Sequence, residues 1–166
     1  MVTLRQYQIS DAERLAAIAN NPNVARYLSA SFPHPYTLED ARWWIKTGST
    51  AGGGISKAIE YQGKLVGGVG IAPLTGWQSH VAEIGYWLGE AYWGQGIATK
   101  AVKQISEFAF QELGYQKLYG RVYTYNEASM AVLKKCGYQL EAILKSEICR
   151  DGQYLDVHRF SRWISE

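Results

Sequence analysis

The feature that most constrains this chain is a predicted strand that leads through a glycine turn into a long helix. Residues 82–88 form an apolar, strand-like run, and residues 97–113 carry apolar side chains at helical spacing. Gly94 and Gly96 lie between them. Glycine lets backbone N–H groups turn toward a ligand, and the first turn of a helix has unpaired N–H donors and the positive end of the helix dipole. The junction therefore predicts an anion site of main-chain amides, suited to a diphosphate.

The glycine turn differs from the two best-known phosphate-binding loops. It lacks the Lys-Ser/Thr pair of a P-loop, which argues against nucleoside triphosphate hydrolysis. It also lacks the third glycine of the dinucleotide-binding fingerprint and occurs in the middle of the chain. A tight turn without any ligand stays open as the alternative.

Composition limits the class of protein. A length of 166 residues with 47% hydrophobic content suits a single globular domain over residues 1–166. A net charge of +2, spread along the chain, argues against a nucleic-acid partner. Cys136 and Cys149 have neither a disulfide pattern nor metal-ligand spacing, so we expect a cytoplasmic protein without a metal. We also expect no signal peptide and no membrane span, because no apolar run is long enough.

Periodicity predicts a mixed α/β domain. Seven strands are expected near residues 2–7, 56–61, 65–72, 81–88, 117–125, 139–149 and 154–164. Helices are expected near residues 11–20, 24–28, 38–47, 97–113 and 126–135, with Thr37 and Asn126 as caps for the third and fifth. Turns at residues 62–64 and 150–152 indicate two hairpins, and residues 47–54 read as a mobile loop of small side chains.

Four segments, in this order and spacing, resemble the GNAT N-acetyltransferases, and within them the RimJ/RimL type that acetylates ribosomal-protein N-termini. The segments are Val24–Leu28 with Pro35–Ala41, Glu83–Leu88, Tyr92–Ala101 and Asn126–Tyr138. The resemblance covers nearly the whole chain. It implies a single α+β domain whose central, mostly antiparallel sheet of about seven strands splays in the middle and is flanked by about four helices.

The resemblance also implies where acetyl-CoA binds. The diphosphate would lie on the amides of Gln95, Gly96, Ile97, Ala98 and Thr99, next to Trp93 and Gly94. Trp93 stands where the family usually has Gln or Arg, so no side-chain contact is expected from it. The pantetheine arm would enter the gap between two diverging strands and pair with the main chain of Trp87 and Leu88, as an added strand would. Asn126, Ser129 and Lys135 would complete the coenzyme contacts.

Two residues are expected to carry the chemistry. Glu83 is the candidate base that removes a proton from the amine, and the alternative is an ion pair at a strand end. Ser129 occupies the position from which this branch would protonate the CoA thiolate, and the alternative is a capping serine. Tyr123 and Tyr125 are alternative acids, although aromatic residues on strands usually pack.

The acceptor is expected to enter opposite the coenzyme, past Tyr27, Phe32, Trp77 and Glu83. A protein N-terminus is the first expectation, because of the RimJ/RimL resemblance. A polyamine, an amino acid or an aminoglycoside is the rival acceptor, and a non-catalytic acyl-CoA sensor or an interaction domain without a coenzyme site is the rival class. Exposed strand edges make a homodimer an additional expectation.

Overall fold

The computed structural model describes residues 1–164 of the chain. Its strands are β1 (Val2–Arg5), β2 (Ile55–Tyr61), β3 (Lys64–Pro73), β4 (Val81–Leu88), β5 (Lys117–Tyr123), β6 (Gln139–Arg150) and β7 (Gln153–Trp163). Its α-helices are α1 (Ala12–Ala19), α2 (Pro22–Ala25), α3 (Leu38–Lys46), α4 (Ile97–Gln111) and α5 (Glu127–Lys135). The short 3₁₀ segments are η1 (Ile9–Asp11), η2 (Gly48–Gly53), η3 (Gly76–Gln78) and η4 (Glu90–Tyr92).

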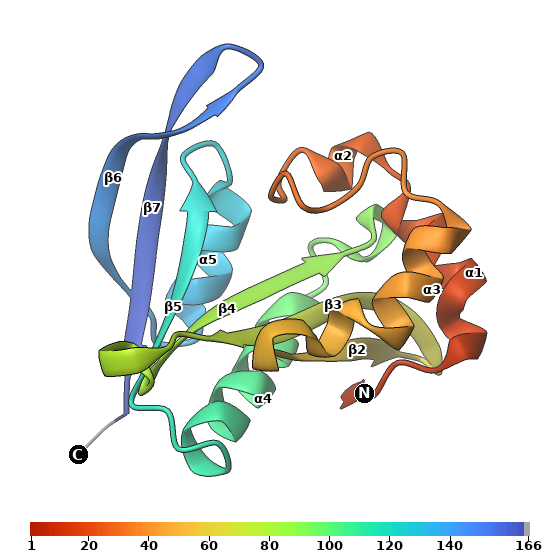
Figure 1. Cartoon of the computed structure of the whole chain (residues 1–166), viewed down its shortest axis with the longest axis horizontal. Coiled ribbons are helices and arrows are strands. Elements are labelled where there is room, and N and C mark those ends of the chain that lie inside the picture. Colours follow the sequence, from red (N-terminus) through yellow and green to blue (C-terminus); the bar gives the residue numbers. More distant parts are fainter. Residues whose placement is uncertain (165–166) are drawn as a thin grey trace.

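The strands form one seven-stranded sheet in the order β1-β2-β3-β4-β5-β7-β6. Every neighbouring pair is antiparallel except β4 and β5, which are parallel. Helices α4 and α5 pack on one face through a core that includes Ile105 and Leu133, and α1 and α3 pack on the other face around Leu15. This confirms the expected mixed sheet between two helical layers (Figure 1). None of the helices within residues 1–164 is long and apolar enough to cross a membrane.

Local sequence explains several element boundaries. Thr37 caps α3 by accepting a hydrogen bond from the Asp40 N–H at 3.1 Å, while the Asp40 carboxylate accepts from the Thr37 N–H at 2.7 Å. Both predicted hairpins turn at two residues of positive φ, at Gln62-Gly63 (52° and 72°) and Asp151-Gly152 (52° and 76°). Positive φ at both positions matches the twist of the flanking strands, which is why these turns form tight hairpins.

The segment after α3, expected to be a loop of small side chains, contains short 3₁₀ turns that are interrupted by non-helical backbone at Ala51 and Gly52. Residues 48–53 form the 3₁₀ segment η2, in which Ser49 is buried. A Cβ at Gly48 would lie 2.6 Å from the rings of both Trp43 and Trp44, so only glycine lets the chain pass beneath the two indoles. Trp43 itself is 58% exposed.

Candidate active site

The parallel strands β4 and β5 separate after a short paired stretch. Their register covers only Val81–Glu83 against Lys117–Tyr119, and beyond it the strands diverge (Figure 1). The opened sheet contains a cleft of about 590 Å³ that reaches from Glu83 to the start of α4. The expected splay in the middle of the sheet is therefore present, and it leaves main-chain groups of both strands without a strand partner.

Strand register decides which β4 groups face the cleft. The Gly89 N–H donates to the Val66 carbonyl at 2.9 Å, and the Leu74 N–H donates to the Val81 carbonyl at 3.1 Å. Antiparallel ladders alternate, and the β3–β4 register has no shift, so odd-numbered residues of β4 bond to β3. The main chains of the even-numbered residues, including Tyr86 and Leu88, point toward β5 and the cleft.

This alternation corrects one expectation about the coenzyme contacts. The main chain of Trp87 is engaged with β3, and its side chain packs in the core under α1 and α3. The Leu88 carbonyl accepts a hydrogen bond from the Trp93 indole at 2.9 Å. The groups that β4 offers in the cleft therefore include the N–H and carbonyl of Tyr86 and the N–H of Leu88.

The glycine turn has the geometry of an anion site. Gly94 and Gly96 have φ of 71° and 72°, and Gly96 is the N-cap of α4. The first backbone hydrogen bond of α4 is donated by Lys100 to the Gly96 carbonyl at 3.2 Å. Among residues 1–164, no backbone carbonyl outside the hydrogen-bond ladder of α4 accepts a hydrogen bond from the N–H groups of residues 94–99. The left-handed glycines turn these donors toward the cleft mouth, beside the positive end of the α4 dipole.

Ser129 is held by a tyrosine from the opposite strand. Its N–H donates to the Asn126 side chain at 3.2 Å, so Asn126 caps α5. Its Oγ lies 2.6 Å from the Tyr86 hydroxyl, which also reaches the Ser129 carbonyl at 3.1 Å. Burial raises the pKa of Tyr86, with the Ser129 hydrogen bond opposing the shift, so this phenol stays protonated at neutral pH. The pair connects β4 to α5 across the cleft on the face that carries α4 and α5.

Glu83 faces the other side of the sheet. Its carboxylate accepts a hydrogen bond from the Tyr119 hydroxyl at 3.2 Å. Burial, followed by the charge and hydrogen bond of Glu83, raises the pKa of Tyr119, so Tyr119 keeps the proton that it donates. Side chains alternate along β4, so Glu83 and Trp87 share one face while Tyr86 lies on the other. The candidate base and the candidate acid therefore approach the cleft from opposite faces.

The segment from α2 to α3 roofs the end of the cleft away from the paired strands. The Tyr123 hydroxyl donates to the Leu28 carbonyl at 3.3 Å, and the Arg26 carbonyl accepts from the Tyr125 hydroxyl. Arg150, near the tip of the β6–β7 hairpin, also donates to the Arg26 carbonyl at 2.6 Å. Figure 1 shows α2 between β4 and the upper part of β5. These bonds hold this segment against β5 and the β6–β7 hairpin.

The comparisons with known proteins agree with this geometry. The family model of the acetyltransferase (GNAT) domain matches residues 1–139. The chain belongs to the GNAT acetyltransferase family. It is 31% identical over 164 residues to YoaA of Bacillus subtilis, an N-acetyltransferase named as uncharacterized, covering 95% of this chain and 90% of YoaA.

Solved structures show the same fold. RimL, a ribosomal L7/L12 alpha-N-protein acetyltransferase in complex with coenzyme A, has a TM-score of 0.85 at 22% identity, covering 98% of this chain and 94% of that one. Spermidine N-acetyltransferase of Vibrio cholerae, in complex with CoA and spermine, has a TM-score of 0.81 at 23% identity, covering 98% and 95%. The family match and the YoaA relative show that the protein is an acetyl-CoA-dependent N-acetyltransferase. The two solved structures differ in their named acceptor, ribosomal L7/L12 for one and spermidine for the other.

Most residues expected at the acetyltransferase site line the cleft. They are Tyr27, Glu83, Trp87, Leu88, Trp93, Gly94, Gly96, Ile97, Ala98, Thr99, Asn126, Ser129 and Lys135. Gln95 contributes to the loop, but its side chain turns back to donate to the Ala91 carbonyl at 3.0 Å. The neighbouring Lys134 places its Nζ 5.9 Å from the Phe160 ring centroid.

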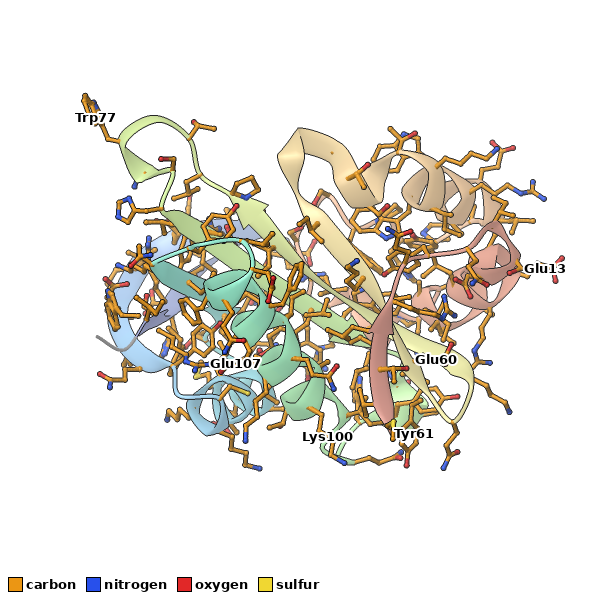
Figure 2. The ribbon with its side chains drawn as sticks, turned by 90° about the horizontal axis from the view of Figure 1, so that it is seen from below. Glu13, Glu60, Tyr61, Trp77, Lys100 and Glu107 are labelled. Atoms are coloured by element: carbon orange, nitrogen blue, oxygen red, sulfur yellow. The ribbon has the colours of Figure 1, made fainter. Side chains whose placement is uncertain are left out.

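Two residues expected at the acceptor pocket lie elsewhere. Trp77 is 99% exposed and projects from η3 at the edge of the molecule, away from the cleft, which corrects that expectation (Figure 2). Phe32 is not part of the cleft wall, and its ring packs against Trp87 at 5.5 Å and Tyr36 at 5.1 Å between centroids. Phe32 therefore supports the wall from behind.

Sequence reasoning missed three residues with evident roles. Tyr86 holds Ser129, Arg121 faces the cleft from β5, and Arg150 holds the roof. The alternation of Tyr119, Arg121 and Tyr123 on one face of β5 was a usable signal for Arg121. The contacts of Tyr86 and Arg150 span 43 and 124 residues, respectively, and no local pattern reports such contacts. Among residues 1–164, no group of three or more His, Cys, Asp and Glu residues is arranged to hold a metal ion.

Proposed function

We propose that this acetyltransferase transfers the acetyl group of acetyl-CoA to a primary amine, in the first place the α-amine of a protein N-terminus, by direct attack in a ternary complex. The observation that carries the proposal is the cleft left where β4 and β5 part, with an amide loop at one end and a carboxylate and a hydroxyl on its two faces. The RimL likeness supports the choice of a protein N-terminus, since RimL is an alpha-N-protein acetyltransferase.

The coenzyme would be held mainly by main-chain groups. The N–H groups of residues 94–99 would bind the diphosphate, and Lys135 at the end of α5 would lie near its more distant phosphate. The pantetheine arm would pair with the free main-chain groups of Tyr86 and Leu88, in the place of a missing strand. A free N–H of β4 in this position can also polarise the thioester carbonyl.

The reaction needs one proton removed and one supplied. Glu83 would accept a proton from the attacking ammonium, directly or through water, so that the neutral nitrogen can form its bond to the acetyl carbon. As the carbon–sulfur bond breaks, the nitrogen gives up its second proton, and the Ser129 hydroxyl, held by Tyr86, would donate its proton to the departing sulfur and be reprotonated in turn. The products are the acetylated amine and CoA thiol.

The test is release of CoA thiol with a panel of acceptors. We expect turnover with peptides that have free N-termini, and loss of turnover when the peptide N-terminus is blocked. Glu83→Gln is expected to lower turnover by about 10²- to 10⁴-fold while leaving acetyl-CoA binding intact. Wild-type protein that binds acetyl-CoA and releases no CoA thiol with any amine would refute the transferase proposal and favour a sensor.

Charge in the cleft disfavours a polycationic acceptor. Among the residues lining the cleft, Glu83 supplies the carboxylate, while Arg121 and Lys135 are cations. A site for a polyamine or an aminoglycoside would attract its substrate with several carboxylates. An amino acid is therefore the small-molecule alternative that fits this cleft best.

A further inference from the structure

Arg121 is a cation on the acceptor face of the cleft that has no partner in the protein. It lies on β5 between Tyr119 and Tyr123, and its side chain is exposed and lines the cleft. It makes no hydrogen bond from its side chain and no ion pair within residues 1–164, although Glu83 lines the same cleft. An arginine presents a planar set of donors that suits a carboxylate, so its free state marks an anion-binding position.

A second arginine lies directly across from it. Arg121 is paired in register with Arg159 of β7, so both side chains leave the same face of the sheet. Arg159 already has two neighbours: its guanidinium stacks 3.8 Å from the Tyr119 ring centroid, and its Nε forms an ion pair with Glu141 at 3.2 Å, although this buried Nε makes no well-aligned hydrogen bond. Glu141 also pairs with Lys117 at 2.5 Å, so it already serves two cations. Like charges opposite one another destabilise a sheet, and an acidic ligand at Arg121 would remove that cost.

The position of Arg121 relative to Glu83 sets the shape of the ligand. Glu83 pairs in register with Tyr119, and Arg121 is the next residue along that face of β5. Two residues of a strand span about 6.6 Å. A ligand whose amine reaches Glu83 would therefore place beside Arg121 a group that lies a few bonds from that amine.

We propose that the acceptor carries an acidic group close to its amine and that Arg121 binds this group. The proposal rests on the transferase function above and names a class of acceptor for the same site. A carboxylate suits Arg121 whether it belongs to a free amino acid or to an acidic side chain at the start of a peptide. Arg121 would then select the acceptor and orient its amine toward Glu83.

The experiment compares acceptors that differ in one acidic group. One pair is a peptide with Asp at its second position and the same peptide with Asn, and the other is an α-amino acid and its amide. We expect the wild-type enzyme to favour the acidic member of a pair by about 10- to 100-fold in kcat/KM, mainly through KM. The pair that shows the preference identifies whether the carboxylate comes from a peptide or from a free amino acid.

Variants assign the preference to Arg121. Arg121→Gln should remove this preference by lowering kcat/KM for the acidic member of each pair much more than for the neutral member, because the anion contact is lost. Arg42→Gln, which removes an exposed arginine of α3 outside the cleft, is the matched control and should keep the preference. Equal use of both members of each pair by the wild type, or a preference that survives in Arg121→Gln, would overturn the proposal.

A failure of the transferase proposal can be told apart from a failure of this one. If the wild type turns over no amine, acceptor binding to the CoA-saturated protein is measured by calorimetry with the same two pairs. Tighter binding of the acidic member that disappears in Arg121→Gln would still support Arg121 as the carboxylate site. Equal binding of both members would overturn it.

Discussion

Gly96→Ala is the sharpest test of the amide loop. Gly96 has a φ of 72°, and a Cβ built there would meet no atom within 4 Å, so the cost of alanine comes from the backbone alone. The left-handed conformation costs an L-residue about 1–2 kcal/mol. The loop can escape this cost by rotating out of the conformation, which turns its N–H groups away from the ligand. Restoring the loop on binding would then weaken CoA affinity by about 5- to 30-fold, at tenfold per 1.4 kcal/mol.

A matched control lies at the other end of the same helix. Gly114 has a φ of 75° and equally open surroundings, but it follows the C-terminus of α4, away from the cleft. Gly114→Ala should therefore bear the same backbone cost in thermal stability and bind CoA within about twofold of the wild type. Gly96→Asn should retain more affinity than Gly96→Ala, since Asn tolerates the left-handed region. Isothermal titration with CoA is the assay, and equal affinities of Gly96→Ala and Gly114→Ala would refute the role of the loop amides.

Three further predictions concern catalysis and stability. Ser129→Ala should lower kcat by about 10- to 100-fold with CoA affinity unchanged. Adding Tyr86→Phe should lower kcat little further, since the two hydroxyls act as one unit, and a fully additive loss in kcat would contradict this. Glu83→Gln should lower kcat/KM by about 10²- to 10⁴-fold in stopped-time assays of acetylated product, and near-wild-type activity would exclude Glu83 as the base. Asp11→Asn should cost about 1–3 kcal/mol of unfolding free energy at pH 7, because it leaves Arg5 without its 2.7 Å and 2.9 Å hydrogen bonds; urea unfolding would measure this. Burial alone would raise the pKa of Asp11, but the hydrogen bonds from Arg5 and Gln8 lower it below its usual value. The stabilisation by Asp11 is therefore present above the unfolded pKa of about 3.9, and it is lost as pH falls through the lower pKa of the folded state.

The parts of the fold that sequence predicted well are set by neighbouring residues. The Thr37 cap, the two hairpin turns and the left-handed Gly96 depend on interactions within a few positions, and each was found where it was expected. Periodicity likewise located the seven strands, because buried faces repeat every second residue. Strand ends were less accurate: β5 ends at Tyr123 rather than at residue 125, and the Tyr125 hydroxyl donates to the carbonyl of Arg26, the residue that follows α2.

The parts that sequence missed depend on register and on distant contacts. Assigning the coenzyme pairing to Trp87 failed because the side of β4 that faces the cleft follows from its alignment with β3, which sequence does not report. Trp77 was expected at the acceptor because of its side-chain type alone, yet it lies almost fully exposed. Tyr86 carries no local signal of its role, since its partner Ser129 comes from another element 43 residues away.

A crystal structure of the protein with bound CoA tests the central claim most directly. We expect the diphosphate within hydrogen-bond distance of the N–H groups of residues 94–99, and the pantetheine arm between β4 and β5, bonded to the main chain of Tyr86 and Leu88. CoA bound away from this loop, or strands β4 and β5 paired along their whole length around an empty turn, would contradict the claim.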